Sequence, residues 1–109
     1  MDPCAVIERI IEEYAAIPFA YEPELALLPV FDRQRGQFLL MVVGWGAQGE
    51  RVHYCMLHIA LRDGKYWIEE DTTEEGVATD LERAGVARDQ IVLAFHQPEL
   101  RAHSGYAVA

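Results

Sequence analysis

The chain has 109 residues, 51% of them hydrophobic and 25% charged, a composition typical of one folded domain with one hydrophobic core. Its 18 acidic residues against 9 basic ones give a formal net charge of −9, and so acidic a surface argues against a protein that binds nucleic acid alone. No apolar run is long enough to cross a membrane, and the acidic N-terminal segment lacks the cations of a signal peptide, so we expect a cytoplasmic single domain over residues 1–109 without membrane contact.

The first predicted element is a helix over about residues 3–17. Asp2 and Pro3 form a typical helix start, an acceptor at the cap followed by proline in the first turn. Apolar residues then recur at helical spacing as far as Ile17, and the following segment, PFAYEPE, contains two prolines that end the pattern.

Four strands are predicted next, in the segments LALLPVFD, QFLLMVVGW, RVHYCMLHIAL and KYWIEE. The connections are short enough to make neighbouring strands antiparallel, so the four strands form a meander. Asp63 and Gly64 predict a type I′ turn between the last two strands, because both central residues of that turn need a positive φ. The register that this turn sets gives three opposite pairs on one face: Arg62 and Lys65, Ala60 and Trp67, His58 and Glu69.

The segment after the fourth strand predicts a second helix over about residues 73–84. Thr72 and Glu75 have capping-box spacing, and Gly85 is typical of a helix end. IVLAF then predicts a short buried segment, QPEL a single helical turn, and the last residues an apolar tail. The fold class is therefore α+β, a four-stranded antiparallel meander with an N-terminal helix, a helix after the fourth strand, and a short C-terminal strand or turn before the tail.

The polar residues do not form a pattern typical of an enzyme. His53 and His58 are an odd number of residues apart, so an unbroken strand would send them to opposite faces and they would not share a metal. The acidic cluster EEDTTEE lacks the nearby lysine of a two-metal nuclease, and we find no nucleophile context, phosphate loop or dinucleotide fingerprint. We therefore expect a protein without catalytic activity, metal or cofactor.

A polar cluster is nevertheless the first candidate for function. A small hydrolase or nuclease subunit, built around His58, His96, Glu69 and Asp71, stays open as an alternative. Arg101 is expected to bind a carboxylate such as Asp71 or Glu99. The members of the polar cluster are Arg51, His53, His58, Glu69, Asp71, Thr73, Glu74, His96 and Arg101.

Two further sets of residues are candidates for contact with other molecules. The first and third turns of a meander lie at the same end of the sheet, and their cations form a basic rim that either meets a partner or nucleic acid or is merely solvated. The apolar tail either lies on the chain's own sheet or adds a strand to a partner. The basic rim is Arg33, Arg35, Arg62 and Lys65, and the tail is Tyr106, Ala107, Val108 and Ala109.

The chain resembles the XisI family over essentially its whole length. The resemblance rests on ordered blocks: VVGW at 42–45, RVH at 51–53, HI at 58–59, KYWIEEDTTEEGVATDL at 65–81 and IVLAFHQPELRAHSGYAVA at 91–109. One departure is Thr72, where a glycine is expected. The matching positions are Trp45, Arg51, His53, His58, Trp67, Asp71, Thr73, Glu74, Gly76, His96, Pro98, Arg101, Tyr106 and Ala107.

Members of this family are controlling factors for excision of the fdxN element, a DNA segment that site-specific recombination removes in filamentous cyanobacteria when heterocysts differentiate. The resemblance implies an accessory role beside an XisH-like protein of nuclease-like fold and the recombinase XisF. We expect a non-catalytic factor whose acidic surface docks on a basic XisH-like partner, alone or within a recombinase–DNA complex. A direct DNA-binding subunit that uses the basic rim is the alternative, and an open sheet of this size also often pairs with a copy of itself.

Overall fold

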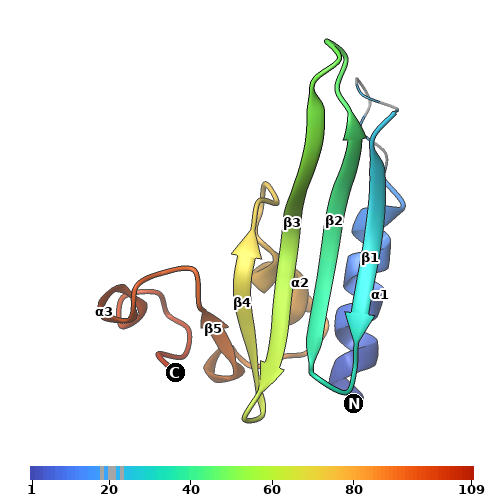
Figure 1. Ribbon diagram of the computed structural model, residues 1–109. Coiled ribbons are helices and arrows are strands. Elements are labelled where there is room, and N and C mark those ends of the chain that lie inside the picture. The colour runs from blue at the N-terminus through green and yellow to red at the C-terminus, as the bar shows by residue number, and fades with distance from the viewer. Residues whose placement is uncertain (18, 20–21, 23) are drawn as a thin grey trace.

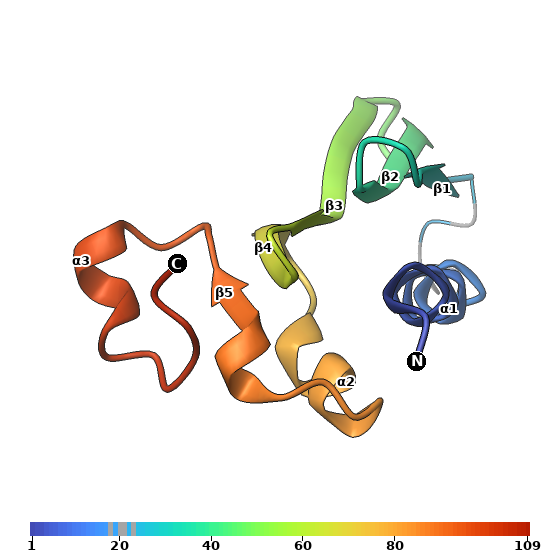
Figure 2. The ribbon, with the colours of Figure 1, turned by 90° about the horizontal axis from the view of Figure 1, so that it is seen from below.

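The chain folds into two layers, a sheet and the helices that pack on it (Figure 1). The computed structural model describes residues 1–17, 19, 22 and 24–109. In chain order the elements of these residues are α1 (Pro3–Ala15), β1 (Ala26–Asp32), β2 (Gln37–Trp45), β3 (Arg51–Arg62), β4 (Lys65–Asp71), α2 (Val77–Arg83), the 3₁₀ turn η1 (Arg88–Gln90), β5 (Ile91–Leu93) and α3 (Pro98–Arg101). The strands form one sheet in the order β1-β2-β3-β4-β5, and α1 and α2 lie on the same face of it (Figure 2).

The first four strands form the predicted antiparallel meander, and the α+β class is confirmed. The sheet differs from the prediction because the buried segment that begins at Ile91 forms β5, which pairs with β4 in parallel. A parallel neighbour needs a crossover connection, and α2 together with η1 supplies it. The sheet of the described residues is therefore mixed.

Helix α1 begins where the sequence predicts and ends two residues early, at Ala15. The Asp2 carboxylate accepts a hydrogen bond from the Cys4 N–H at 3.0 Å, as expected of an N-cap. The helix buries one apolar face against the sheet, formed by Val6, Ile7, Ile10 and Ile11. The two prolines expected to end it, Pro18 and Pro23, lie outside the described residues.

Helix α2 begins at Val77 rather than near residue 73. The predicted capping box of Thr72 and Glu75 is wrong, because the Asp71 carboxylate takes the N–H of Val77 instead, at 2.7 Å. The Thr72 hydroxyl donates to the carbonyl of Met56 at 3.0 Å, which ties the loop to β3. The cap of α2 is thus supplied by the end of β4.

The hairpin of β3 and β4 departs from the predicted register at one position. Asp63 (φ 54°) and Gly64 (φ 75°) have the positive φ of the expected turn. The predicted pair of His58 and Glu69 is wrong, because a β-bulge leaves Glu69 unpaired and places His58 opposite Glu70. The other two predicted pairs are confirmed, Arg62 with Lys65 and Ala60 with Trp67.

A second bulge breaks β3 at Met56. Leu57 and Cys55 lie opposite consecutive residues of β2, so Met56 is an extra residue that reverses the alternation of the strand. His53 and His58 therefore lie on the same face, and the expectation of opposite faces, which assumed an unbroken strand, is wrong. They lie opposite Leu39 and Val43, four residues apart on β2, so they are still about 13 Å apart along the strand at roughly 3.3 Å per residue.

The core lies between the sheet and helices α1 and α2. Phe38 and Leu40 of β2 are fully buried there, as are Leu57 and Ile59 of β3. From the helical side they meet Ile7, Ile11, Val77 and Leu81. No helix within the described residues is long and apolar enough to span a membrane.

Candidate interaction surfaces

Asp71 connects the end of β4 to α2. One of its carboxylate oxygens accepts hydrogen bonds from the Thr73 N–H, at 2.9 Å, and from the Thr73 hydroxyl. The other accepts from the Val77 N–H, a donor that the helix itself leaves unsatisfied. Asp71 and Thr73, two members of the predicted polar cluster, therefore position the loop and the start of α2.

Replacing Asp71 with alanine is expected to lower the free energy of unfolding by about 1–2 kcal/mol, the cost of losing a capping acceptor. Denaturant unfolding followed by circular dichroism measures the loss. Asp71→Asn keeps one acceptor oxygen and should lose less. Equal stability of Asp71→Ala and the wild type would contradict the capping role.

A surface of mixed character lies between α1 and α2, where the Tyr14 hydroxyl donates to the Asp80 carboxylate. Burial and the bonded Asp80 together raise the pKa of Tyr14 far above its ordinary value, so the phenol stays neutral. Ile17 is 67% exposed at the margin of a hollow of about 180 Å³. Arg83 brings Glu75 to the same place, because its guanidinium lies 4.0 Å from Glu75 and 3.9 Å from Asp80. We call this surface the helix seam: Glu13, Tyr14, Ile17, Glu75 and Asp80.

The opposite face of the sheet carries an apolar stripe that no described helix covers (Figure 2). Leu28 and Val30 of β1 are 45% and 49% exposed. They lie opposite Met41 and Leu39 of β2, so their side chains share one face. An antiparallel sheet with one face to water normally carries polar residues on that face. We call this the outer stripe: Leu28, Val30, Leu39, Met41, Val43 and Cys55.

Three members of the polar cluster border the outer stripe. His58 shares a hydrogen bond of 2.6 Å between a ring nitrogen and the Gln37 side-chain oxygen. His53 is exposed, opposite a valine of β2. The Arg51 guanidinium lies 5.2 Å from the centre of the Trp45 ring, at the far end of the β2–β3 hairpin. These three side chains all belong to β3 and lie along one side of the apolar surface.

The remaining members of the cluster are dispersed. Glu69 is the bulged residue of β4, and Glu74 is exposed in the loop before α2. The His96 ring packs against Phe95 with a centroid distance of 4.5 Å. Among the described residues, no three His, Cys, Asp or Glu side chains converge on a point that could hold a metal ion.

The basic rim divides into two kinds of cation. Arg33 forms two hydrogen bonds with the Glu8 carboxylate, at 2.8 and 2.6 Å, and this contact lowers the pKa of Glu8. Arg35 binds Asp32 at 3.0 Å. Both turn arginines are therefore partnered by carboxylates, which reduces what this half of the rim offers to a phosphate.

The other half of the rim belongs to a set of four cations that form no ion pair with an Asp or Glu side chain among the described residues. The Arg62 guanidinium stacks 3.8 Å from the centre of the Trp67 ring, and Lys65 donates to the carbonyl of Ala109. The remaining five cations of the chain all form ion pairs. The members of this set are Arg51, Arg62, Lys65 and Arg101.

Arg101 fastens the C-terminal segment to the sheet. Its guanidinium donates to three backbone carbonyls, those of His96 at 3.1 Å, Ala94 at 3.2 Å and Val108 at 3.4 Å. It also lies over the Trp67 ring, on which Arg62 stacks. The expected carboxylate partner, Asp71 or Glu99, is wrong, because backbone oxygens take these donors.

The tail lies along the edge of β5. The Ala107 N–H donates to the Ile91 carbonyl at 2.8 Å and forms an isolated parallel bridge. The Tyr106 hydroxyl donates to Glu82 at 2.7 Å, and Arg88 lies over the Tyr106 ring while binding the same carboxylate. Tyr106 and Arg88 together lower the pKa of Glu82. Of the two arrangements that the sequence leaves open, the structure has the self-docked one.

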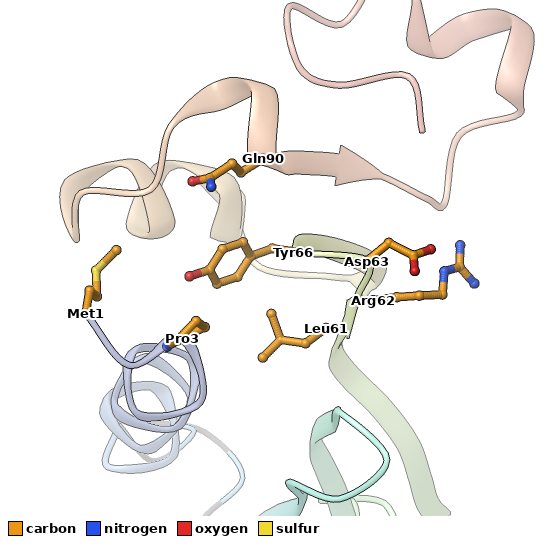
Figure 3. Close-up of a pocket in the computed structure, with 8 residues that line it drawn as sticks. Met1, Pro3, Leu61, Arg62, Asp63, Tyr66 and Gln90 are labelled. Carbon is orange, nitrogen blue, oxygen red and sulfur yellow. The ribbon is translucent and has the colours of Figure 1, made fainter.

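A separate hollow of about 350 Å³ lies between the start of α1 and the β3–β4 turn (Figure 3). The Tyr66 ring is almost fully buried and its hydroxyl points toward Met1 and Pro3. Burial raises the pKa of this phenol. Arg62 and Asp63 are the two charged residues of its lining, and the ends of their side chains point away from Tyr66 (Figure 3).

The outer stripe is the feature that the sequence analysis missed. Its signal is present in the chain, because LALLPVF and QFLLMVV are nearly continuous apolar runs rather than alternating ones. Such runs are typical of strands that are apolar on both faces. The contact of Tyr106 with Glu82 has no comparable signal, since it joins residues 24 positions apart.

These features define a two-layer α+β protein with two exposed surfaces of opposite character, the helix seam and the outer stripe. The family model described as XisI protein matches residues 3–108, and the chain belongs to the XisI family.

Solved structures of two proteins from Anabaena variabilis ATCC 29413 have the same fold. One, a XisI-like protein, is 28% identical with a TM-score of 0.86, and the match covers 96% of this chain and 94% of that one. The other, fdxN element excision controlling factor XisI, is 30% identical with a TM-score of 0.81 and the same coverage of both chains. No curated protein matches the sequence.

Proposed function

We propose that this protein is an accessory factor that controls excision of a DNA element by binding a partner protein. The observation that carries the proposal is membership of the XisI family, in which a relative of the same fold is called an fdxN element excision controlling factor. The dispersed polar cluster is consistent with a role in binding rather than in catalysis.

The helix seam is the surface that best suits a basic partner. Glu13 and Asp80 line the hollow beside the exposed Ile17. The Arg83 guanidinium lies 3.9 Å from Asp80 and 4.0 Å from Glu75, and this single cation leaves the three carboxylates with an excess of negative charge. An apolar anchor within a charged rim is the usual anatomy of a protein interface, and the rim guides the approach of a partner of opposite charge. The chain's formal net charge of −9 strengthens that attraction. We assign to this surface an XisH-like protein of nuclease-like fold with a basic docking face.

Calorimetric titration of this protein with an XisH-like protein from the same organism tests the proposal. We expect a complex that weakens as salt rises, because the contact is partly electrostatic. Ile17→Arg with Glu75→Lys should weaken it at least about tenfold, by removing the anchor and reversing a rim charge. Asp89→Lys, a charge reversal on the exposed turn η1, is the matched control and should bind as the wild type does. Absence of a complex at any salt concentration would overturn the proposal.

Direct DNA binding is the second candidate function. It is favoured by the four cations that pair with no Asp or Glu side chain in the described part of the chain, Arg51, Arg62, Lys65 and Arg101. Duplex DNA in place of the XisH-like protein discriminates the two functions. A binding constant that falls steeply with salt, and less steeply in Arg51→Ala with Arg62→Ala, would favour this second function.

A further inference from the structure

The outer stripe is a surface for which the fold itself provides no cover among the described residues. Its exposed members, Leu28 and Val30, continue without interruption into the partly buried Leu39, Met41 and Val43 of the next strand. Isolated exposed apolar residues are ordinary, but a contiguous patch over neighbouring strands marks a site of association. The composition of this face therefore favours association with another surface.

The edges of the sheet are less suited to association than its face. At one edge β1 contains Pro29, which has no N–H to donate to a further strand. At the other edge the Ala107 N–H already bonds to Ile91 of β5. Proline at an edge and a covering segment are two common protections against edge-to-edge pairing. An occupant would therefore pack on the outer stripe rather than extend the sheet.

The accessible surface area of the chain is larger than that of a typical monomer of the same mass. The accessible surface is 6648 Å² for 12.3 kDa, where a compact monomer of that mass exposes about 6,100 Å². The excess, on the order of 500 Å², approaches what one partner contributes to an interface of standard size, about 800 Å². The molecule is also elongated, 42 × 29 × 24 Å.

We infer that the outer stripe packs against the outer stripe of a second copy of this chain. Two sheets can pack face to face with their strands nearly aligned, and aliphatic side chains of the two inner faces interdigitate. Interfaces between identical subunits are the more apolar kind, and a two-fold arrangement needs one self-complementary patch. A patch of leucine, valine and methionine meets that requirement, whereas a strongly charged face would repel itself.

The distribution of charge agrees with this pairing. The positions that share the face with the stripe include the cations Arg51, Arg62 and Lys65 and the carboxylates Asp32 and Glu70. The face is thus nearly balanced although the whole chain has a net charge of −9. Most of the excess negative charge lies on other surfaces. When two copies join through this face, their excess negative charges therefore stay away from the interface and repel each other less. The helix seam stays free on both copies, and the inference does not rest on the proposed function.

Sedimentation equilibrium of the full chain across micromolar to hundred-micromolar concentrations tests the inference. We expect a mass of twice 12.3 kDa at the upper end. Leu28→Lys with Val30→Lys should raise the dimer dissociation constant by at least about a hundredfold, since both copies lose apolar anchors and gain facing charges. Leu100→Lys with Val108→Lys, two aliphatic side chains of similar exposure away from the stripe, is the matched control and should leave the mass unchanged.

A native circular dichroism spectrum of the Leu28→Lys, Val30→Lys variant, and a melting temperature equal to that of the wild type at concentrations where both are monomeric, show that dissociation is not unfolding. A wild type that stays monomeric throughout overturns the inference, and so does a dimer that this variant leaves intact. If the wild type is monomeric and the same variant abolishes binding of the XisH-like protein, the stripe belongs to that partner instead. The proposed function is tested separately, by the calorimetric titration of the wild type and of the Ile17→Arg, Glu75→Lys variant with the XisH-like protein.

Discussion

Replacing Arg101 with alanine is expected to lower the free energy of unfolding by about 2–4 kcal/mol and to release the C-terminal segment from β5. The guanidinium donates to three carbonyls, two before α3 and one in the tail, those of His96, Ala94 and Val108. One side chain therefore closes the loop that contains α3. Hydrogen bonds to a charged group contribute more than neutral ones, and Arg101 is partly buried, which limits competition by water.

Hydrogen exchange measures the loss of stability in Arg101→Ala and also shows which part of the chain it affects. In Arg101→Ala the amide of Ala107, which bonds to Ile91, should lose protection far more than the amides of β2 and β3. Arg101→Lys keeps the charge but not the planar set of donors, so it should recover only part of the stability. Arg62→Ala is the control for the aromatic contact alone, because Arg62 stacks on the same ring without a described hydrogen bond to the tail. Full protection of Ala107 in Arg101→Ala would contradict this role.

The elements that local chemistry determines are those that the sequence predicts correctly. The start of α1 follows from Asp2 and Pro3, and the turn between β3 and β4 from Asp63 and Gly64, because each signal acts within a few residues. The two bulges, at Met56 and Glu69, have no local signature, and each changes which side chains face one another. They arise from pairing with a neighbouring strand, which a pattern of single residues does not encode.

Long-range contacts explain the other differences. Helix α2 starts late because its cap, Asp71, belongs to β4, and β5 joins the sheet only after a crossover brings it back. Asp71 and Arg101, two members of the polar cluster, have structural contacts, and most of their partners are backbone groups that no spacing rule identifies. The outer stripe was overlooked for a different reason. A strand that is apolar on both faces has the sequence pattern of a strand buried on both sides. Only the arrangement of the helices shows which face of the sheet is exposed to solvent.

Replacing Gly36 with alanine is expected to cost about 2–4 kcal/mol of unfolding free energy, because two penalties act at one position. Gly36 has φ 66°, a conformation that residues with a Cβ rarely adopt. A Cβ there would lie 2.6 Å from the backbone oxygen of Leu61, and backbone cannot move aside as a flexible side chain can. The Gly36 carbonyl also accepts the Leu61 N–H at 2.8 Å, so relief of the clash would weaken the bond that joins the β1–β2 turn to β3.

Gly49 separates these two penalties. It has φ 81°, yet a Cβ at this position meets no atom within 4 Å, so Gly49→Ala carries the conformational cost alone, about 1 kcal/mol. Chemical denaturation of the two variants under the same conditions measures the loss of unfolding free energy in each. The difference between the two losses is the cost of the clash between the β1–β2 turn and β3. Because that turn aligns Val30 with Leu39, Gly36→Ala should also weaken association through the outer stripe, whereas Gly49→Ala should not. Equal losses of stability in the two variants would show that the turn moves away from β3 at little cost.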